Sequence, residues 1–207
     1  MPTILGLDEA GRGCVLGPLV VGAFFYKTDD DSAIKATGAT DSKKLSPKKR
    51  KAILERLQKI GTGEVAEVSA VEIDNGNLNQ LEEKLFLQLI EQYNPDIVYI
   101  DAPTHPRGIP AVLKRLQENL THLERIPQFI IEPKADLNYP VVGAASIFAK
   151  VHRDAQIKAL GDVGSGYPSD PKTKKWLSGF IQRKEEFPAC VRTRWGTIEN
   201  LKQQSLF

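Results

Sequence analysis

Two adjacent carboxylates, Asp8 and Glu9, follow an apolar segment at residues 3–7 and precede an arginine flanked by two glycines. Carboxylate oxygens are the ligands that hard divalent cations such as Mg²⁺ and Mn²⁺ prefer. A Gly-Arg-Gly loop allows a substrate to approach its backbone closely, because glycine carries no Cβ. A candidate metal-binding pair beside such a loop favours metal-assisted chemistry on a phosphate group.

Two more acids follow apolar segments: Asp101 comes directly after residues 97–100, and Asp136 comes a few residues after 129–131. Functional groups in α/β sheets gather where strands end, so four carboxylates would converge if these strands were neighbours. Their repulsion would then require a cation, and two ions about 3.5–4 Å apart would support in-line phosphoryl displacement. Spacing alone does not favour Asp136 over Glu132, and a single Asp at a strand end is often a turn or cap residue.

The adjacency of Asp8 and Glu9 imposes a geometric condition. Neighbouring residues of a β-strand point to opposite faces of the sheet. Both carboxylates can therefore serve one metal cluster only if the strand ends or bulges at this point, or if one of them binds through water.

The hydrophobic pattern predicts the elements that would position these groups. Strands are predicted at residues 3–7, 18–26, 63–71, 97–100 and 129–131. The first two strands are expected to be antiparallel neighbours. The last two are expected to be buried, and strand 97–100 is expected to be parallel to its neighbours. Helices are predicted at residues 47–60, 78–93, 110–120, 142–160, 171–181 and 197–204, with an acidic turn at 28–32. Ser46 and Pro47 suit the start of the first helix. Three strands followed by alternating helices and strands predict an α/β fold, a mixed sheet with helices on both faces.

The composition fits an ordinary globular protein of 207 residues, with 41% hydrophobic and 26% charged residues. A net charge of +2 does not by itself indicate a nucleic-acid partner, although basic residues cluster at 43–44 and 48–51. Cys14 and Cys190 have no metal-ligand spacing and are expected to be buried thiols. Without a leader or a membrane-spanning stretch, the expected location is the cytoplasm.

Seven strings in order along the chain resemble type 2 ribonuclease H (ribonuclease HII), most closely its archaeal branch. They lie at residues 8–13, 17–21, 41–45, 99–103, 134–136, 144–154 and 164–171. The resemblance implies a ribonuclease H-like fold in a single domain, with a core at about 1–160 and a helical C-terminal extension at about 161–207. It also implies endonucleolytic cleavage of RNA in RNA–DNA hybrids and at single ribonucleotides embedded in duplex DNA. The expected products carry 5′-phosphate and 3′-hydroxyl ends.

The resemblance also assigns roles to particular residues. The four acids that match the family's catalytic and metal-binding positions are Asp8, Glu9, Asp101 and Asp136, with two Mg²⁺ or Mn²⁺ ions expected. The positions expected to bind substrate are Gly11, Arg12, Gly13, Lys43, Ser146, Lys150 and Tyr167. Within this set, the glycine loop would read the 2′-hydroxyl through its backbone, and Tyr167 would stack on the sugar. Arg153 shares helical spacing with Ser146 and Lys150.

The sequence offers three alternative functions. The first is a non-catalytic nucleic-acid-binding protein, which the complete set of four acids disfavours. The second is a DNA-specific nuclease, which the glycine loop together with Tyr167 disfavours. Ribonuclease HIII carries an additional N-terminal domain for which 207 residues leave no room.

The end of the chain, Gln203 to Phe207, resembles a shortened sliding-clamp binding motif, with a frayed terminus as the alternative. A monomer without membrane contact is expected.

Overall fold

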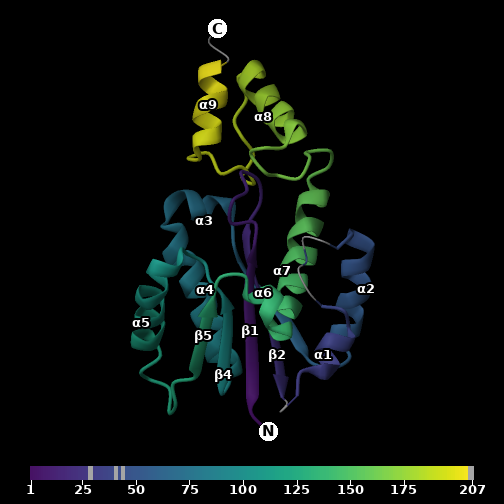
Figure 1. Ribbon diagram of the computed structural model, residues 1–207. Helices are drawn as coiled ribbons and strands as arrows, with labels where there is room; N and C mark the ends of the chain where they lie inside the picture. Colours follow the sequence, from purple (N-terminus) through teal and green to yellow (C-terminus); the bar gives the residue numbers. More distant parts are fainter. Residues whose placement is uncertain (28–29, 40–41, 43–44, 205–207) are drawn as a thin grey trace.

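The computed structural model describes residues 1–27, 30–39, 42 and 45–204 and has a mixed five-stranded sheet at its centre (Figure 1). The strand order is β3-β2-β1-β4-β5. The strands span Thr3–Ala10 (β1), Leu19–Lys27 (β2), Thr62–Val68 (β3), Ile97–Asp101 (β4) and Gln128–Glu132 (β5). β2 is antiparallel to both β1 and β3, whereas β4 is parallel to both β1 and β5. The predicted mixed sheet is confirmed.

Helices cover both faces of the sheet, as predicted. The helices span Ser32–Ala36 (α1), Pro47–Leu57 (α2), Ala70–Asn75 (α3), Leu78–Tyr93 (α4), Ile109–Asn119 (α5), Ala135–Asn138 (α6), Pro140–Ala159 (α7), Pro171–Arg183 (α8) and Gly196–Gln204 (α9). In Figure 1, α7, α2 and α1 lie on one side of β1, and α4 and α5 lie on the other. The two hydrophobic clusters with the most buried residues divide in the same way, since Ile4 packs with α7 whereas Leu5 and Leu7 pack with α4.

Two glycines of the sheet, Gly6 and Gly22, allow helix α7 to approach it closely. A Cβ on Gly6 would come 2.2 Å from the carbonyl oxygen of Val141, and a Cβ on Gly22 would come 2.2 Å from that of Ala145. Both contacts are shorter than van der Waals contact, so a side chain at either position would push the helix away. The close approach brings the polar side chains of α7 to the carboxyl end of β1.

Several predicted boundaries are wrong, each for a local reason. The strand predicted at 63–71 ends at Val68, because Ser69 and Glu72 form a capping box that starts α3. The helix predicted at 47–60 ends at Leu57. The turn predicted at 28–32 gives way to α1 at Ser32, and α6 was not predicted. Strand β5 was predicted to be buried, but it is a half-buried edge strand.

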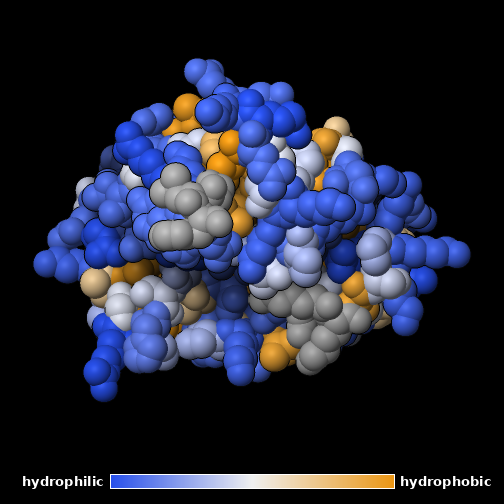
Figure 2. Space-filling model, turned by 90° about the horizontal axis from the view of Figure 1, so that it is seen from above, coloured by the Kyte–Doolittle hydropathy of each residue, from blue (hydrophilic) through white to orange (hydrophobic). Residues whose placement is uncertain are grey.

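The C-terminal helices α8 and α9 pack together above the end of β1 (Figure 1). Their apolar residues form a separate cluster with Val15 and Leu16, which belong to the loop between β1 and β2. Seen from this end, the surface is mostly hydrophilic with scattered hydrophobic residues (Figure 2). Cys14 is a buried free thiol as expected, whereas Cys190 is only half-buried. None of the helices in the described ranges has an apolar stretch that would span a bilayer.

Candidate active site at the carboxyl ends of the central strands

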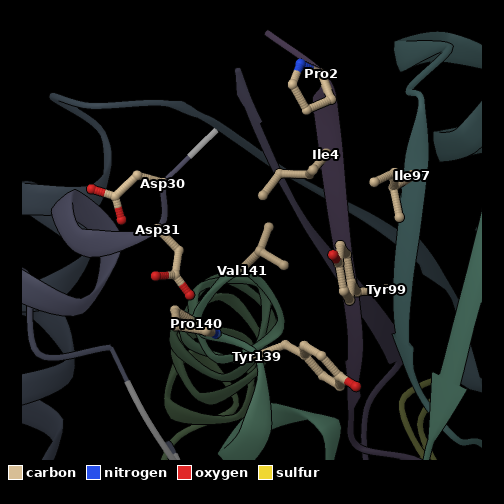
Figure 3. Close-up of a pocket in the computed structure, with 9 residues that line it drawn as sticks. All are labelled: Pro2, Ile4, Asp30, Asp31, Ile97, Tyr99, Tyr139, Pro140 and Val141. Atoms are coloured by element: carbon tan, nitrogen blue, oxygen red, sulfur yellow. The ribbon is translucent and has the colours of Figure 1, made fainter. Parts of the chain in front are cut away.

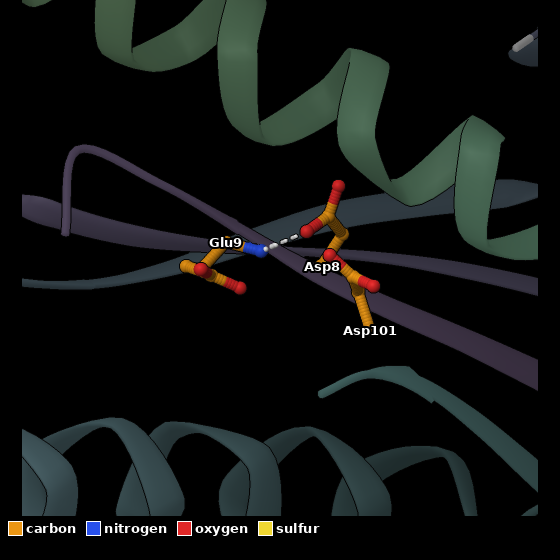
Figure 4. Close-up of side chains that lie close together, drawn as sticks. All are labelled: Asp8, Glu9 and Asp101. Carbon is orange, nitrogen blue, oxygen red and sulfur yellow. Dashed lines mark hydrogen bonds between the residues drawn. The ribbon is translucent and has the colours of Figure 1, made fainter. Parts of the chain in front are cut away.

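The acids predicted at the ends of β1 and β4 meet in space. One carboxylate oxygen from each of Asp8, Glu9 and Asp101 lies within 4.8 Å of the other two (Figure 4). β1 does not end at this point, since it continues to Ala10 in register with β2. Its pairing with β4, however, stops at Leu7, which leaves that edge of β1 open beside the carboxylates.

The side chains of Asp8 and Asp101 lie next to each other, and Glu9 extends to the other side of the strand (Figure 4). The Asp8 carboxylate accepts the backbone N–H of Glu9 at 2.8 Å. β1 neither ends nor bulges at Asp8 and Glu9, in contrast to two of the predicted conditions. The carboxylate oxygens of the two neighbours still approach one another from opposite faces of β1, at the place where β4 no longer pairs with the strand.

Asp136 reaches the same edge from α6. The backbone turns at Lys134, which has a φ of 61°, and the next N–H, that of Ala135, donates to Asp101 Oδ1 at 2.8 Å. Asp136 is buried, and its negative charge contributes to raising the pKa of Asp8. It is not among the three acids whose oxygens meet within 4.8 Å. The alternative residue, Glu132, accepts the Tyr139 hydroxyl at 2.8 Å.

Burial and mutual repulsion make this cluster electrostatically unfavourable without a counter-charge. Burial, followed by the charge of Glu9, raises the pKa of Asp8 well above its usual value, and the Ser146 hydroxyl opposes this by donating to Asp8. Burial and the charges of Glu82 and Asp101 raise the pKa of Glu9 to about 7. Glu9 Oε2 is buried and has no hydrogen-bond partner within the described ranges. An all-carboxylate donor set with an orphaned oxygen fits a hard divalent cation such as Mg²⁺ or Mn²⁺.

Helix α4 contributes two residues to the site, Asn79 and Glu82, that were not predicted from the sequence. Both contact Arg12 of the glycine loop: Arg12 forms an ion pair with Glu82 and donates a second hydrogen bond to Asn79 Oδ1. Glu82 is almost fully buried, and burial raises its pKa to about 7 against the opposing effect of Arg12. Glu82 lies four residues after Leu78, on the apolar face of the helix, and a charge on that face was the available signal.

A cleft of about 470 Å³ opens beside Glu9 and joins the predicted substrate-binding residues. Six of the seven line it, namely Gly11, Arg12, Gly13, Ser146, Lys150 and Tyr167; Lys43 is outside the described residues. Its neighbour Ser42 lines the cleft and forms a 2.7 Å hydrogen bond with the hydroxyl of Ser146. Four segments of the chain, which contribute residues 9–13, 42 and 50, 146 and 150, and 167, thus form one cavity next to the acids.

Two basic residues, Arg50 and Arg153, are buried near the cleft. Arg50, from the basic cluster, is buried, lines the cleft and donates to the carbonyl oxygens of Ser42 and Leu45 at 3.0 and 2.6 Å. Arg153 is also buried and donates to Cys14 Sγ at 2.9 Å. The Arg153 guanidinium carbon lies 5.1 Å from the centre of the Tyr167 ring, so Arg153 supports this ring from within the protein.

A second cavity, of about 370 Å³, lies at the opposite end of the sheet near the N-terminus. Figure 3 shows Ile4, Ile97, Tyr99 and Tyr139 around it, with Asp30 and Asp31 at one side. None of the predicted site residues lines this cavity, and the candidate chemistry therefore belongs to the cleft beside Glu9.

Comparisons with known proteins agree with the fold. The family model described as Ribonuclease HII matches residues 5–198. Ribonuclease HII from Archaeoglobus fulgidus is 40% identical over 97% of both chains. The crystal structure of ribonuclease H2 from Pyrococcus horikoshii OT3 covers 98% of both chains at 35% identity, with a TM-score of 0.85. The structure of the PCNA:RNase HII complex from Archaeoglobus fulgidus matches at 38% identity over 97% of both chains, with a TM-score of 0.84.

These matches confirm the resemblance that the seven sequence strings indicated, and with it the ribonuclease H-like fold class. The matched residues include all four acids and every residue that lines the cleft. The chain belongs to the ribonuclease HII family, the metal-dependent ribonucleases H that cut RNA in RNA–DNA hybrids.

Proposed function

We propose that this protein also cleaves at single ribonucleotides embedded in duplex DNA, by hydrolysis that depends on two divalent ions and leaves 5′-phosphate and 3′-hydroxyl ends. The observation that supports the proposal is that the carboxylate cluster and the cleft adjoin each other. The carboxylate cluster opens onto a cleft whose walls carry a glycine loop, a lysine and a half-exposed tyrosine. Acids alone would suit many nucleases, whereas the adjoining cleft offers groups suited to a ribose.

Asp8, Glu9, Asp101 and Asp136 would hold the ions, either Mg²⁺ or Mn²⁺. When bound, such ions supply activation of water and neutralisation of charge on the scissile phosphate. The chain itself orients the groups around them. The Ser146 hydroxyl fixes the Asp8 carboxylate, and Glu82 holds Arg12 in place at the wall of the cleft.

Lys150 and Tyr167 would contact the substrate from the other wall. Lys150 Nζ lies 6.0 Å from the centre of the Tyr167 ring and 2.8 Å from Asp154 Oδ1, so its charge is held at the cleft. Burial raises the pKa of Tyr167 from its usual value of 10 to about 12, so its hydroxyl is neutral at physiological pH, as an unperturbed tyrosine would also be. A neutral phenol beside a lysine suits stacking on a sugar next to a phosphate. Lys43, in the adjoining loop, is proposed as a further substrate contact.

Gly13 provides a test of the recognition loop. A Cβ at this position would meet no atom within 4 Å, so the fold does not require glycine there. We expect Gly13→Ala to leave the thermal unfolding midpoint unchanged but to lower kcat/KM on a duplex with one ribonucleotide about tenfold, because the methyl group would occupy space the substrate needs.

Gly196→Ala is the matched control, since a Cβ at Gly196 also meets nothing within 4 Å and this residue does not line the cleft. Equal kcat/KM values for the two variants would contradict the role assigned to the loop.

The function itself is tested with three duplexes: all-DNA, RNA–DNA hybrid, and DNA with one ribonucleotide, each with Mg²⁺ or with a chelator. We expect Mg²⁺-dependent cleavage of the last two only, with ends that a polymerase extends at the 3′ side. Binding without cleavage would favour a non-catalytic role, and cutting of the all-DNA duplex would favour a DNA nuclease.

We propose in addition that residues 203–207 bind a sliding clamp. The related Archaeoglobus fulgidus enzyme was solved in a complex with PCNA. Helix α9 ends at Gln204, and the last three residues lie outside the described ranges. We expect deletion of 203–207 to abolish co-precipitation with PCNA and to leave cleavage of a ribonucleotide-containing duplex unchanged. Retained co-precipitation would show that the clamp binds elsewhere.

We also propose that residues 1–207 act as one domain. The loop after β1 is part of the hydrophobic cluster of the C-terminal helices, so the predicted core and extension share packed residues rather than meeting at a linker.

A further inference from the structure

Arg192, in the segment between α8 and α9, reaches into the recognition loop from the far end of the chain. Its side chain is fully buried. Nη2 donates to the carbonyl oxygen of Gly11 at 2.7 Å, Nη1 to that of Arg12 at 2.9 Å, and Nε to that of Gly17 at 3.1 Å. One guanidinium therefore connects the beginning and the end of the loop.

These hydrogen bonds determine where the loop's N–H groups point. In a planar trans peptide, a carbonyl and the N–H of the next residue point in opposite directions. Because the carbonyls of Gly11 and Arg12 face Arg192, the N–H groups of Arg12 and Gly13 face away from it. Both residues line the cleft beside Glu9. The loop thus presents adjacent backbone donors on its side opposite Arg192.

The loop needs such a constraint. Gly11 has a φ of 88°. Glycine adopts this positive φ without steric cost, but it adopts negative φ values about as readily. The other carbonyl contact in the turn is the 3.2 Å hydrogen bond from the Cys14 N–H to the Gly11 oxygen. The guanidinium of Arg192 selects one arrangement of this turn.

Arg192 is itself held from several directions. Its backbone N–H donates to the Val15 carbonyl at 2.9 Å. Asp74, at the end of α3, accepts the N–H and the hydroxyl of Thr193 at 2.6 and 2.7 Å. The centre of the Trp195 ring lies 5.1 Å from the guanidinium carbon. Contacts within the protein therefore hold the side chain in place.

Stability alone does not account for this residue. Burial of a guanidinium carries a desolvation cost, and hydrogen bonds to neutral carbonyls offset it less than a carboxylate would. Burial lowers the pKa of Arg192 to about 10, so it remains charged at neutral pH. A buried, charged guanidinium that binds only neutral carbonyl oxygens among the described residues is better explained by the need to hold the loop after β1 in one geometry.

We propose that Arg192 is a positioning residue for ribose recognition, which aims the backbone N–H groups of Arg12 and Gly13 into the cleft. The proposal rests on the proposed function, because it assumes that the loop reads a 2′-hydroxyl. The segment between α8 and α9 would then contribute to substrate specificity, although Arg192 itself does not line the cleft.

The test compares Arg192→Lys with Arg192→Met, and uses Arg194→Lys as control because Arg194 is exposed and two residues away. Each change is made in an Asp8→Asn background to prevent cleavage. Fluorescence anisotropy then gives Kd for a duplex with one ribonucleotide and for the same all-DNA duplex. We expect both Arg192 variants to lose about tenfold of the ribonucleotide preference. Arg194→Lys should retain it.

Each outcome is decisive. An unchanged preference in the Arg192 variants overturns the proposal, as does equal weakening on both duplexes, which would be a general loss of contact. Loss of cooperative thermal unfolding in both variants also overturns it, because the side chain would then serve the fold. If the Asp8→Asn protein with Arg192 intact shows no ribonucleotide preference, the proposed function fails instead.

Discussion

Replacing Asp8 by asparagine is expected to lower the cleavage rate at least about 10³-fold, since metal-ion stabilisation supplies several kcal/mol and each 1.36 kcal/mol is a factor of ten. Asparagine retains the shape of the side chain but removes the charge that three other acids and the Ser146 hydroxyl surround. Substrate binding should persist, because the cleft residues are unchanged. Single-turnover cleavage and anisotropy on the same labelled duplex measure the two quantities.

The matched control is Asp162→Asn, because Asp162 is highly exposed and pairs with Lys172 on the surface. Its cleavage rate should equal that of the unmodified protein. Cleavage by Asp8→Asn within a few-fold of that rate would remove the central acid from the mechanism.

The same substitution should stabilise the protein when no metal is present. Asp8 is buried and repelled by its neighbours, which is why its pKa is raised. Removing that charge removes the repulsion, so the thermal midpoint of Asp8→Asn in a chelator should exceed that of the unmodified protein. A lower midpoint would indicate that Asp8 contributes to the fold through contacts other than these.

Metal-free stability is expected to fall as pH rises from 5.5 to 8, and divalent ions are expected to restore it. The pKa values of Glu9 and Glu82 are both raised from 4.5 to about 7 by burial. For an acid with a raised pKa in the folded state, the stabilising contribution is complete below the unfolded value and disappears as pH passes the folded value. Each pKa unit corresponds to about 1.4 kcal/mol.

Ligand binding to the folded state adds stability. Mn²⁺ should therefore raise the unfolding midpoint more at pH 8, where the acids are ionised, than at pH 5.5. Denaturation at both pH values, with chelator and with Mn²⁺, measures the four midpoints. Asp170, whose pKa is lowered to about 2 by hydrogen bonds from Ser165, titrates below this window.

Glu9→Gln should reduce the slope of the metal-free pH profile, because only Glu82 then remains with a pKa raised to about 7, whereas exposed Glu185→Gln should leave the slope unchanged. A metal-free midpoint that does not change between pH 5.5 and 8 would contradict the electrostatic description of the cluster.

Elements with strong local signals were predictable. The apolar segments of β1, β2 and β4, and the periodic leucines of α4, lie where the pattern placed them. The start of α2 at Pro47 follows from its Ser46 cap, whose hydroxyl accepts the Lys49 N–H. The error at β3 was avoidable, because Ser69 and Glu72 have the spacing of a capping box.

The buried charges were not predictable in the same way. Arg50 belongs to a basic cluster, and Arg153 shares helical spacing with Ser146 and Lys150, but neither pattern indicates burial. Arg50, Arg153 and Arg192 all lie inside the protein and hold backbone or side-chain groups near the cleft. Among the groups that Arg153 and Arg192 contact, Cys14 and Gly11 are 139 and 181 residues away in the sequence.

By itself, the sequence determined which groups can do chemistry here: an acid pair after one strand, single acids near two more, and a glycine loop between two strands. These follow from residue type and local order, which set strand and turn formation directly. Only the tertiary structure decided that β4 stops pairing at Leu7, so that Asp8 and Glu9 meet Asp101 from opposite faces. It also decided that Glu82 pairs with Arg12 across 70 residues, and that Arg192 binds Gly11 across 181. Such contacts depend on how whole elements pack, and no local sequence pattern specifies that.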